Sequence, residues 1–484
     1  MPWIRPSLSS PVSETTLLPI DPSSYYGMAS DYNKGTASFA TVSHLHRFDD
    51  GSALKTQVRK GSYSRDQRAG TVRFANAASQ PGGVAVSLDT FGPNTVLTRG
   101  TQLKIQDMNN LHAQSDYSTR FEAFGLKHEL QAGVDLALEN RSVYAARSAA
   151  QGGVTLTKPN TTVGTPNDGA SVDEGSRVLR KSNQYDAQGW GAYVQDLVQV
   201  APAWKLLAGL RYDYLVGNYD AFSIPTAAPG PEAQTSYQMK VAGWSQRLGA
   251  LFQPNALHSY HFSAGTSYNV SGEAYSLGAA NADTPPEESY NVEIGARLDS
   301  ADKRTTTRLA AFQTVKYRER NTDPLQPGVT VLSGRRHVAG LEIDVSGRLT
   351  PKWEVFGSYM WLPVAKIDVG GQGAEAAGSR PSLTPIYSGT LWSTYQITHP
   401  LRAGAGLNFR GEQTPNRNPG WKAPAYETLD LMLEYRFSER YSLKGNVINV
   451  TDKLYADQLY GSGTSGHYIP GSGRNVQVTF TAKL

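Results

Sequence analysis

The sequence of 484 residues contains no cysteine and no run of about 18 or more apolar residues. The missing apolar run excludes a membrane-spanning helix, which needs about 20 such residues. The missing cysteine suits an oxidising envelope compartment, where stray thiols are a liability. The net charge is only +4 and no basic block occurs, so the sequence lacks the charge pattern of a nucleic-acid-binding protein.

Aromatic residues and glycine, by contrast, are plentiful, with 26 Tyr, 8 Trp and 47 Gly. From residue 36 to the end, apolar residues alternate with polar ones, while the mean hydropathy stays at −0.43. Successive side chains of a strand point to opposite faces, so each alternating row predicts one apolar and one wet wall. The clearest rows lie at 130–138, 204–214, 290–298, 429–437 and 476–484.

The connections between these rows alternate in length. Short turns are expected near 49–51, 125, 202, 254–255, 300–302, 351, 399–400 and 438–439. Long polar loops are expected near 76–94, 148–183, 220–234, 271–286, 319–328, 368–383, 411–424 and 451–472. Aromatic residues flank several turns, as in an interfacial girdle: Phe48, Trp204, Trp353, Phe437 and Tyr441. Short turns at one end and long loops at the other predict an all-β, transmembrane antiparallel β-barrel.

Eight short turns and eight long loops separate about 17 strands. The first expected strand, at 36–48, and the last, at 473–484, both run toward the periplasm. Residues 1–35 are then an extracellular loop remnant, and residues 36–484 are the barrel. Single-chain bacterial barrels have even strand numbers, so an odd count predicts that strands are missing.

Several stretches resemble TonB-dependent siderophore receptors. The carrying residues are PPEESYNVEIG at 285–295, SGRRHVAGLE at 333–342, GRLTPKW at 347–353, NVINVTDKLY at 446–455, and YYG at 25–27 through HRF at 46–48. The segment GHYIPGSGR at 466–474 is most similar to the catecholate-siderophore branch. The resemblance spans nearly the whole chain.

This resemblance implies a barrel of about 22 strands, plugged by a globular domain and driven through TonB. The plug, the TonB box and about five strands have no counterpart here, nor does a secretory signal precede residue 36, so a truncated product or a fragment is expected. The implied location is the outer membrane of a Gram-negative bacterium, in contact with lipid and lipopolysaccharide. The implied activity is uptake of ferric siderophores of the catecholate type, with iron as cargo, no cofactor and no enzymatic step.

A ferric catecholate carries negative charge on flat aromatic rings, which arginine forks and aromatic faces suit. The candidate ligand-binding residues near the outer loops are Tyr25, Tyr26, Arg318, Arg320, Arg335, Arg336, Arg410, Arg417, Trp421 and Tyr468. Basic and aromatic residues are common at barrel mouths, so for any single residue a role at the lipid or lipopolysaccharide edge is the simpler interpretation.

Other chemistry finds little support in the sequence. The G-x-G-x-x-G pattern at 461–466 lies in a polar loop expected to be flexible, without the strand and helix that a dinucleotide site needs. His44 and His46, and His258 and His261, lack recognisable third and fourth zinc ligands. A passive outer-membrane channel and a barrel hydrolase remain as alternatives, although no G-x-S-x-G elbow is present.

Overall fold

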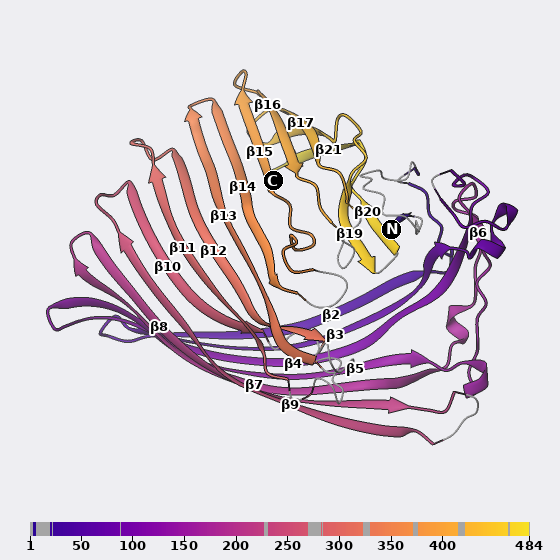
Figure 1. The fold of residues 1–484 in the computed structure, drawn as a ribbon. Helices are drawn as coiled ribbons and strands as arrows, with labels where there is room; N and C mark the ends of the chain where they lie inside the picture. Colours follow the sequence, from indigo (N-terminus) through magenta and orange to yellow (C-terminus); the bar gives the residue numbers. More distant parts are fainter. Residues whose placement is uncertain are drawn as a thin grey trace.

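The computed structural model describes residues 3–5, 20–21, 23–87, 89–226, 231–269, 282, 284–322, 330–370, 376–414, 422–462 and 465–483. Within these ranges, 17 strands pair in one antiparallel sheet of the barrel type, which curves as a wall (Figure 1). The predicted all-β class and strand number are confirmed. No helix in the described ranges is long and apolar enough to span a membrane.

Each strand of the wall pairs with the next one in the chain. In order, the strands are β2 (Tyr32–Arg47), β3 (Ala53–Phe74), β4 (Val96–Ala123), β5 (Leu126–Ala146), β7 (Leu179–Ala201), β8 (Trp204–Ser223), β9 (Ala233–Phe252), β10 (His258–Asn269), β11 (Glu287–Asp299), β12 (Thr305–Thr322), β13 (Thr330–Thr350), β14 (Trp353–Val369), β15 (Tyr387–Gln396), β16 (Leu401–Arg410), β17 (Tyr426–Arg436), β18 (Tyr441–Ile448) and β21 (Asn475–Ala482).

The order of pairing begins at β2 and ends at β21. In the described part of the chain, β2 is registered only with β3, and β21 only with β18. Because every pair is antiparallel and the number of strands is odd, β2 and β21 run in the same direction. Among the described residues, each of these two strands therefore has one edge of backbone groups with no registered partner strand.

The register places the predicted apolar rows on one face of the wall. Leu136 of β5 lies opposite Trp190 of β7, which lies opposite Tyr214 of β8. The other face of the same strands carries charged groups, such as Arg211, whose Nη1 lies 2.8 Å from Asp135 Oδ2. The alternation of apolar and wet positions thus becomes an outer apolar face and an inner polar face, as predicted.

The alternation in loop length is also confirmed. The turn between β4 and β5 consists of Phe124 and Gly125, with φ of 54° and 75°, the pairing of positive φ values found in tight hairpins. At the opposite end, long connections such as 75–95 and 147–178 join the strands. The first strand starts at Tyr32 rather than at residue 36. The turn-flanking aromatics Phe48, Trp204, Trp353, Phe437 and Tyr441 are all exposed.

Several short strands and 3-10 helices lie at the long-loop end of the wall. Strand β6 (Thr161–Thr162) pairs with β4, while β19 (Ala456–Ser462), β20 (Ser465–Pro470) and β1 (Trp3–Arg5) form a small sheet. The segment expected as a flexible loop around 461–466 instead contributes to this hairpin, because Gly461 and Ser462 pair with Gly466 and Ser465. The described loops after β3 and β5 also contain four 3-10 helices: η1 (Ala77–Ser79), η2 (Pro81–Gly83), η3 (Ala149–Gln151) and η4 (Glu174–Ser176).

An apolar cluster links the two ends of the wall at this long-loop side. It comprises the buried residues Tyr26, Leu97, Ala423, Ala456, Leu459 and Tyr468. Leu97 belongs to β4, near the first edge, whereas Leu459 and Tyr468 belong to the hairpin inserted before β21, at the last edge. Loop packing therefore connects regions of the wall that the strand order keeps apart (Figure 1).

Candidate functional site

A cavity of about 880 Å³ lies at the long-loop end of β2, β3 and β4. Its floor is the wet face of β3 and β4, where Gln67 pairs with Lys104 and Ala69 with Gln102. Its apolar side is formed by members of the cluster and their neighbours, which are Ile20, Tyr26, Val72, Phe74, Leu97 and Val163. The lining of the cavity therefore combines polar residues of the wet face with apolar residues of the cluster and its neighbours.

The charge of this cavity comes from Arg65 and Lys104. Arg65 donates from Nε to Asn33 Oδ1 at 3.2 Å and from Nη2 to the Gln67 side chain. In the described part of the chain, neither Arg65 nor Lys104 has a carboxylate within ion-pair distance. Asp31 is the one acidic residue among the described lining residues. The amides of Asn33, Gln67 and Gln102 add neutral donors and acceptors.

Tyr25 places an aromatic ring and a hydroxyl at the cavity. Its hydroxyl lies 3.2 Å from Asp31 Oδ2 and 3.3 Å from the Met28 carbonyl oxygen. Burial, together with the nearby Asp31 carboxylate, raises the pKa of Tyr25 to about 12. The hydroxyl is therefore a proton donor at neutral pH. The backbone of Gly27 passes so close that a Cβ there would meet the Tyr25 hydroxyl.

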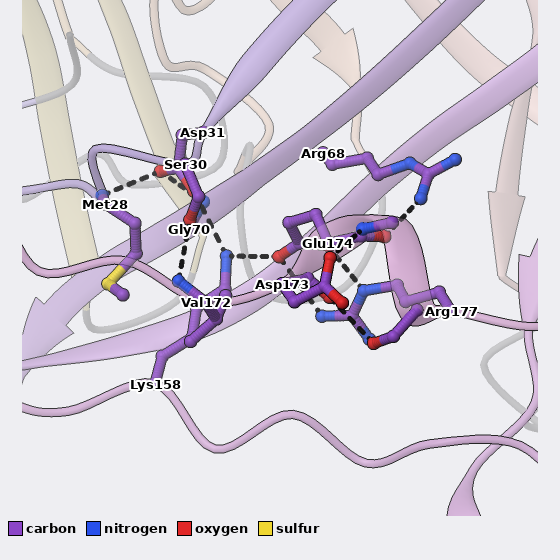
Figure 2. Close-up of polar contacts among 12 residues, drawn as sticks. Met28, Ser30, Asp31, Arg68, Gly70, Lys158, Val172, Asp173, Glu174 and Arg177 are labelled. Carbon is purple, nitrogen blue, oxygen red and sulfur yellow. Dashed lines mark hydrogen bonds and ion pairs between the residues drawn. The ribbon is translucent and has the colours of Figure 1, made fainter.

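Asp31 is the centre of a buried ion network. Its Oδ2 accepts hydrogen bonds from the Gly70 amide at 2.8 Å and the Met28 amide at 3.0 Å. Its Oδ1 lies 3.2 Å from Lys158 Nζ, which is also 3.2 Å from Glu174 Oε1. Figure 2 shows Lys158 reaching toward Asp31 and Glu174 from a separate loop segment. The network thus fastens loop 147–178 to residues 28–31 and to β3.

Two arginines contact Glu174, the second carboxylate of this network. Arg177 Nε lies 2.5 Å from Glu174 Oε2, and Arg68 of β3 donates to the Glu174 carbonyl oxygen. Although burial acts to raise the pKa of Glu174, hydrogen bonds from Arg177 and Lys158 outweigh it and hold the pKa below its ordinary value. The Glu174 carboxylate therefore stays ionised well into the acidic range.

A second set of contacts fixes Tyr26. The fully buried Arg99 of β4 donates from Nε to the Tyr26 carbonyl oxygen at 2.7 Å and pairs through Nη2 with Asp168 at 2.7 Å. The Tyr26 hydroxyl donates to the Val163 carbonyl oxygen at 2.8 Å. Residues 25–31 are therefore held between the wall and loop 147–178, with Tyr25 and Tyr26 at fixed positions.

Three of the predicted ligand-binding residues, Tyr25, Tyr26 and Tyr468, meet around this region. Tyr25 and Tyr26 line the cavity, and Tyr468 packs with Tyr26 in the apolar cluster. Arg410 donates to the Asp457 carbonyl oxygen at 3.1 Å, next to the cluster residue Ala456, and lies 5.6 Å from the Tyr426 ring centroid. Arg410 lines a separate cavity of about 560 Å³ on β13 to β18.

The other described arginines gather at the long-loop ends of β11 to β14, opposite acidic residues. Arg318 pairs with Glu288, and the Arg320 amide donates to Glu287 Oε1 at 3.1 Å. Arg336 Nε lies 2.7 Å from Glu319 Oε2, and Arg335 Nε lies 3.6 Å from Asp368 Oδ2. The side chains of Arg318, Arg335 and Arg336 thus lie beside carboxylates, which weakens their attraction for an anionic ligand. The contact of Arg320 with Glu287 is made by its backbone amide. Arg417 and Trp421 lie outside the described residues.

Sequence reasoning missed Asp31, Arg65, Lys104 and Lys158. The sequence does contain a signal for Arg65 and Lys104. Arg65 and Gln67 are two residues apart on one strand, and Gln102 and Lys104 are two residues apart on the next, so each pair lies on one face of its strand. No local pattern indicates that Lys158 reaches Asp31 across 127 residues of sequence. Among the described residues, no group of three or more His, Cys, Asp or Glu side chains has the arrangement of a metal site.

Comparison with known proteins places this architecture in a family. Residues 3–450 match the family described as TonB dependent receptor-like, beta-barrel. The catecholate siderophore receptor Fiu of Escherichia coli is 25% identical over 507 aligned positions, which cover 98% of this chain and 64% of the receptor. The chain thus spans less than two thirds of that relative's length.

Solved structures show the same fold. The closed form of the ferric-catecholate import receptor Fiu aligns with a TM-score of 0.82 at 23% identity, over 94% of this chain and 65% of the receptor. The siderophore receptor PiuA from Acinetobacter baumannii aligns with a TM-score of 0.82 at 21% identity, over 96% and 67%. The family consists of outer-membrane receptors and transporters rather than enzymes. This chain belongs to the TonB-dependent receptor-like β-barrel family.

Proposed function

We propose that this chain captures ferric siderophores of the catecholate type at the outer mouth of the barrel, for uptake coupled to TonB. The observation that carries the proposal is the cavity of about 880 Å³ at the long-loop end. It combines two cations without carboxylate partners in the described part of the chain with the aromatic rings of Tyr25, Tyr32 and Phe74. A ferric catecholate presents the complementary features, namely negative charge and flat rings.

The relatives support the same ligand class, since Fiu is named a catecholate siderophore receptor. Iron is then cargo held by the siderophore, and no residue of the cavity is required to bind the metal directly. The apolar outer face, with the exposed Trp204 and Trp353, suits contact with membrane lipid, and we propose lipopolysaccharide as the neighbour of the outer rim.

The test measures binding of the ferric complex of a hexadentate tris-catecholamide to the folded chain in detergent. Binding is detected as quenching of tryptophan fluorescence. The double substitution Arg65→Gln with Lys104→Gln should weaken binding by about tenfold or more, because charge-assisted hydrogen bonds contribute about 1.5–3 kcal/mol each. Arg304→Gln is the matched control, since Arg304 lies in the exposed turn after β11, at the other end of the wall.

Two results would contradict this proposal. One is binding that is equally tight in the double variant and in the parent chain. The other is absence of binding together with steady, large conductance steps in planar bilayers, which would indicate the passive channel.

A further inference from the structure

We infer that Lys158 determines the charge selectivity of the cavity by neutralising Asp31 from behind the cavity wall. This inference rests on the proposed function, because it concerns the same cavity and the same anionic ligand. It assigns a role to a residue that does not itself line the cavity.

The first step concerns what Asp31 does to the cavity. Its side chain is only 6% exposed, and it stands among the lining residues beside Tyr25 and Gly70. A carboxylate there is useful for structure, because it accepts the Gly70 and Met28 amides and the Tyr25 hydroxyl. The same negative charge would repel an anionic ligand, because a buried charge is screened less than an exposed one.

The second step concerns how this charge is offset. Lys158 has a side-chain exposure of 1%, and its Nζ lies 3.2 Å from Asp31 Oδ1. Lys158 also approaches Glu174, but Glu174 has a cation of its own in Arg177, at 2.5 Å. Asp31, Lys158, Glu174 and Arg177 (Figure 2) together are therefore neutral. The positive charge of Arg65 and Lys104, which line the cavity, then remains available to the ligand.

Removing Lys158 and removing Asp31 should have opposite effects on an anionic ligand. Lys158→Met leaves one negative charge uncompensated beside the cavity. At about 10 Å from the ligand and an effective dielectric constant of about 20, that charge weakens binding by about tenfold. Asp31→Asn keeps an acceptor for the backbone amides but removes the charge, so it should leave binding equal or tighten it by a similar factor.

The experiment measures the dissociation constant of the ferric tris-catecholamide for the parent chain, Lys158→Met, Asp31→Asn and the double variant, at low and high salt. The double variant restores the neutral balance, so its affinity should return to within about threefold of the parent. The loss in Lys158→Met should shrink as salt rises. Circular dichroism and resistance to heat in detergent check that each variant folds.

The outcomes separate this inference from the proposed function. If the parent does not bind the complex, both fail. If the parent binds and Lys158→Met binds equally well, only the role of Lys158 is overturned. Equal weakening in Lys158→Met and the double variant would show a purely structural role and also overturn it. If Lys158→Met does not fold, Asp31→Asn decides alone, because weaker binding of the anion in that variant contradicts the inference.

Discussion

Gly27 is the residue at which the smallest change should disturb the cavity. An added Cβ would collide with the Tyr25 hydroxyl and lie 2.8 Å from Asp31 Oδ2. Overpacking of this kind costs about 1–3 kcal/mol, so Gly27→Ala should weaken binding of the ferric complex by about tenfold, measured by fluorescence quenching. Gly35→Ala is the control, because the nearest atom there, the Ser64 carbonyl oxygen, is 3.5 Å away. Equal affinities of the two variants would contradict the assigned position of Tyr25.

Arg99 is the residue that holds loop 147–178 and residues 25–26 against the same strand. Arg99→Ala removes the donors to the Tyr26 carbonyl oxygen and to Asp168. Loss of one partner of a buried pair costs about 3–5 kcal/mol, and we expect about half of that here because Asp168 is 24% exposed. Limited proteolysis should then cut loop 147–178 much faster, whereas replacement of the exposed Arg73 of β3 should not change the rate.

Glu174 makes the stability of the same loop depend on pH. Its pKa is held below the ordinary value of 4.5, so its ionised form stabilises the folded loop at every pH above that value. This stability is lost as the pH falls from 4.5 through the lower pKa of the folded state. Protease sensitivity of loop 147–178 should therefore rise only below about pH 4.5. A rise between pH 7 and pH 5 would mean that another group controls the loop.

Among the strands, the two faces should differ sharply in their tolerance of charge. Ile294 of β11 is 58% exposed and lies in register with Phe262 and Ala311 on the outer face. Ile294→Arg should destabilise the barrel by about 2–4 kcal/mol, the penalty for arginine near the bilayer midplane. Asn291→Arg, on the wet face of the same strand, should change stability by less than about 1 kcal/mol. Urea unfolding in lipid vesicles measures both, and similar losses would contradict the assigned faces.

The strands were predictable, and the cavity was not, for a physical reason. In the segment 290–298, apolar residues recur at every second position, and this pattern predicts which side chains face outward. The pattern depends only on residues that are close in sequence. The partner of each strand follows from the short turn that joins it, as at Phe124 and Gly125. Contacts such as Lys158 with Asp31, or Tyr26 with Tyr468, join distant segments through irregular loops, for which no periodicity exists. The arginine-to-carboxylate pairs at β11 to β14 likewise depend on strand register, which the sequence alone does not specify.

For the whole molecule, the ends of the strand order should be the most dynamic part of the wall. Amides of β2 and β21 that point away from β3 and β18 have no ladder partner in the described residues. Hydrogen exchange of this chain in detergent should therefore be fast at alternate positions of these two strands and slow throughout β7, which is paired on both sides. Uniformly slow exchange in β2 would indicate that its outer edge is occupied.

The common direction of β2 and β21 also limits what can lie between them. Laid side by side, they would form a parallel contact in a wall whose described strand pairs are all antiparallel. One strand, three or five can run between them with every neighbour reversed, whereas two or four cannot. A second molecule in the same bilayer orientation meets the same obstacle, since its β2 would arrive parallel to β21. Strands that run between β2 and β21 with every neighbouring pair antiparallel are therefore odd in number.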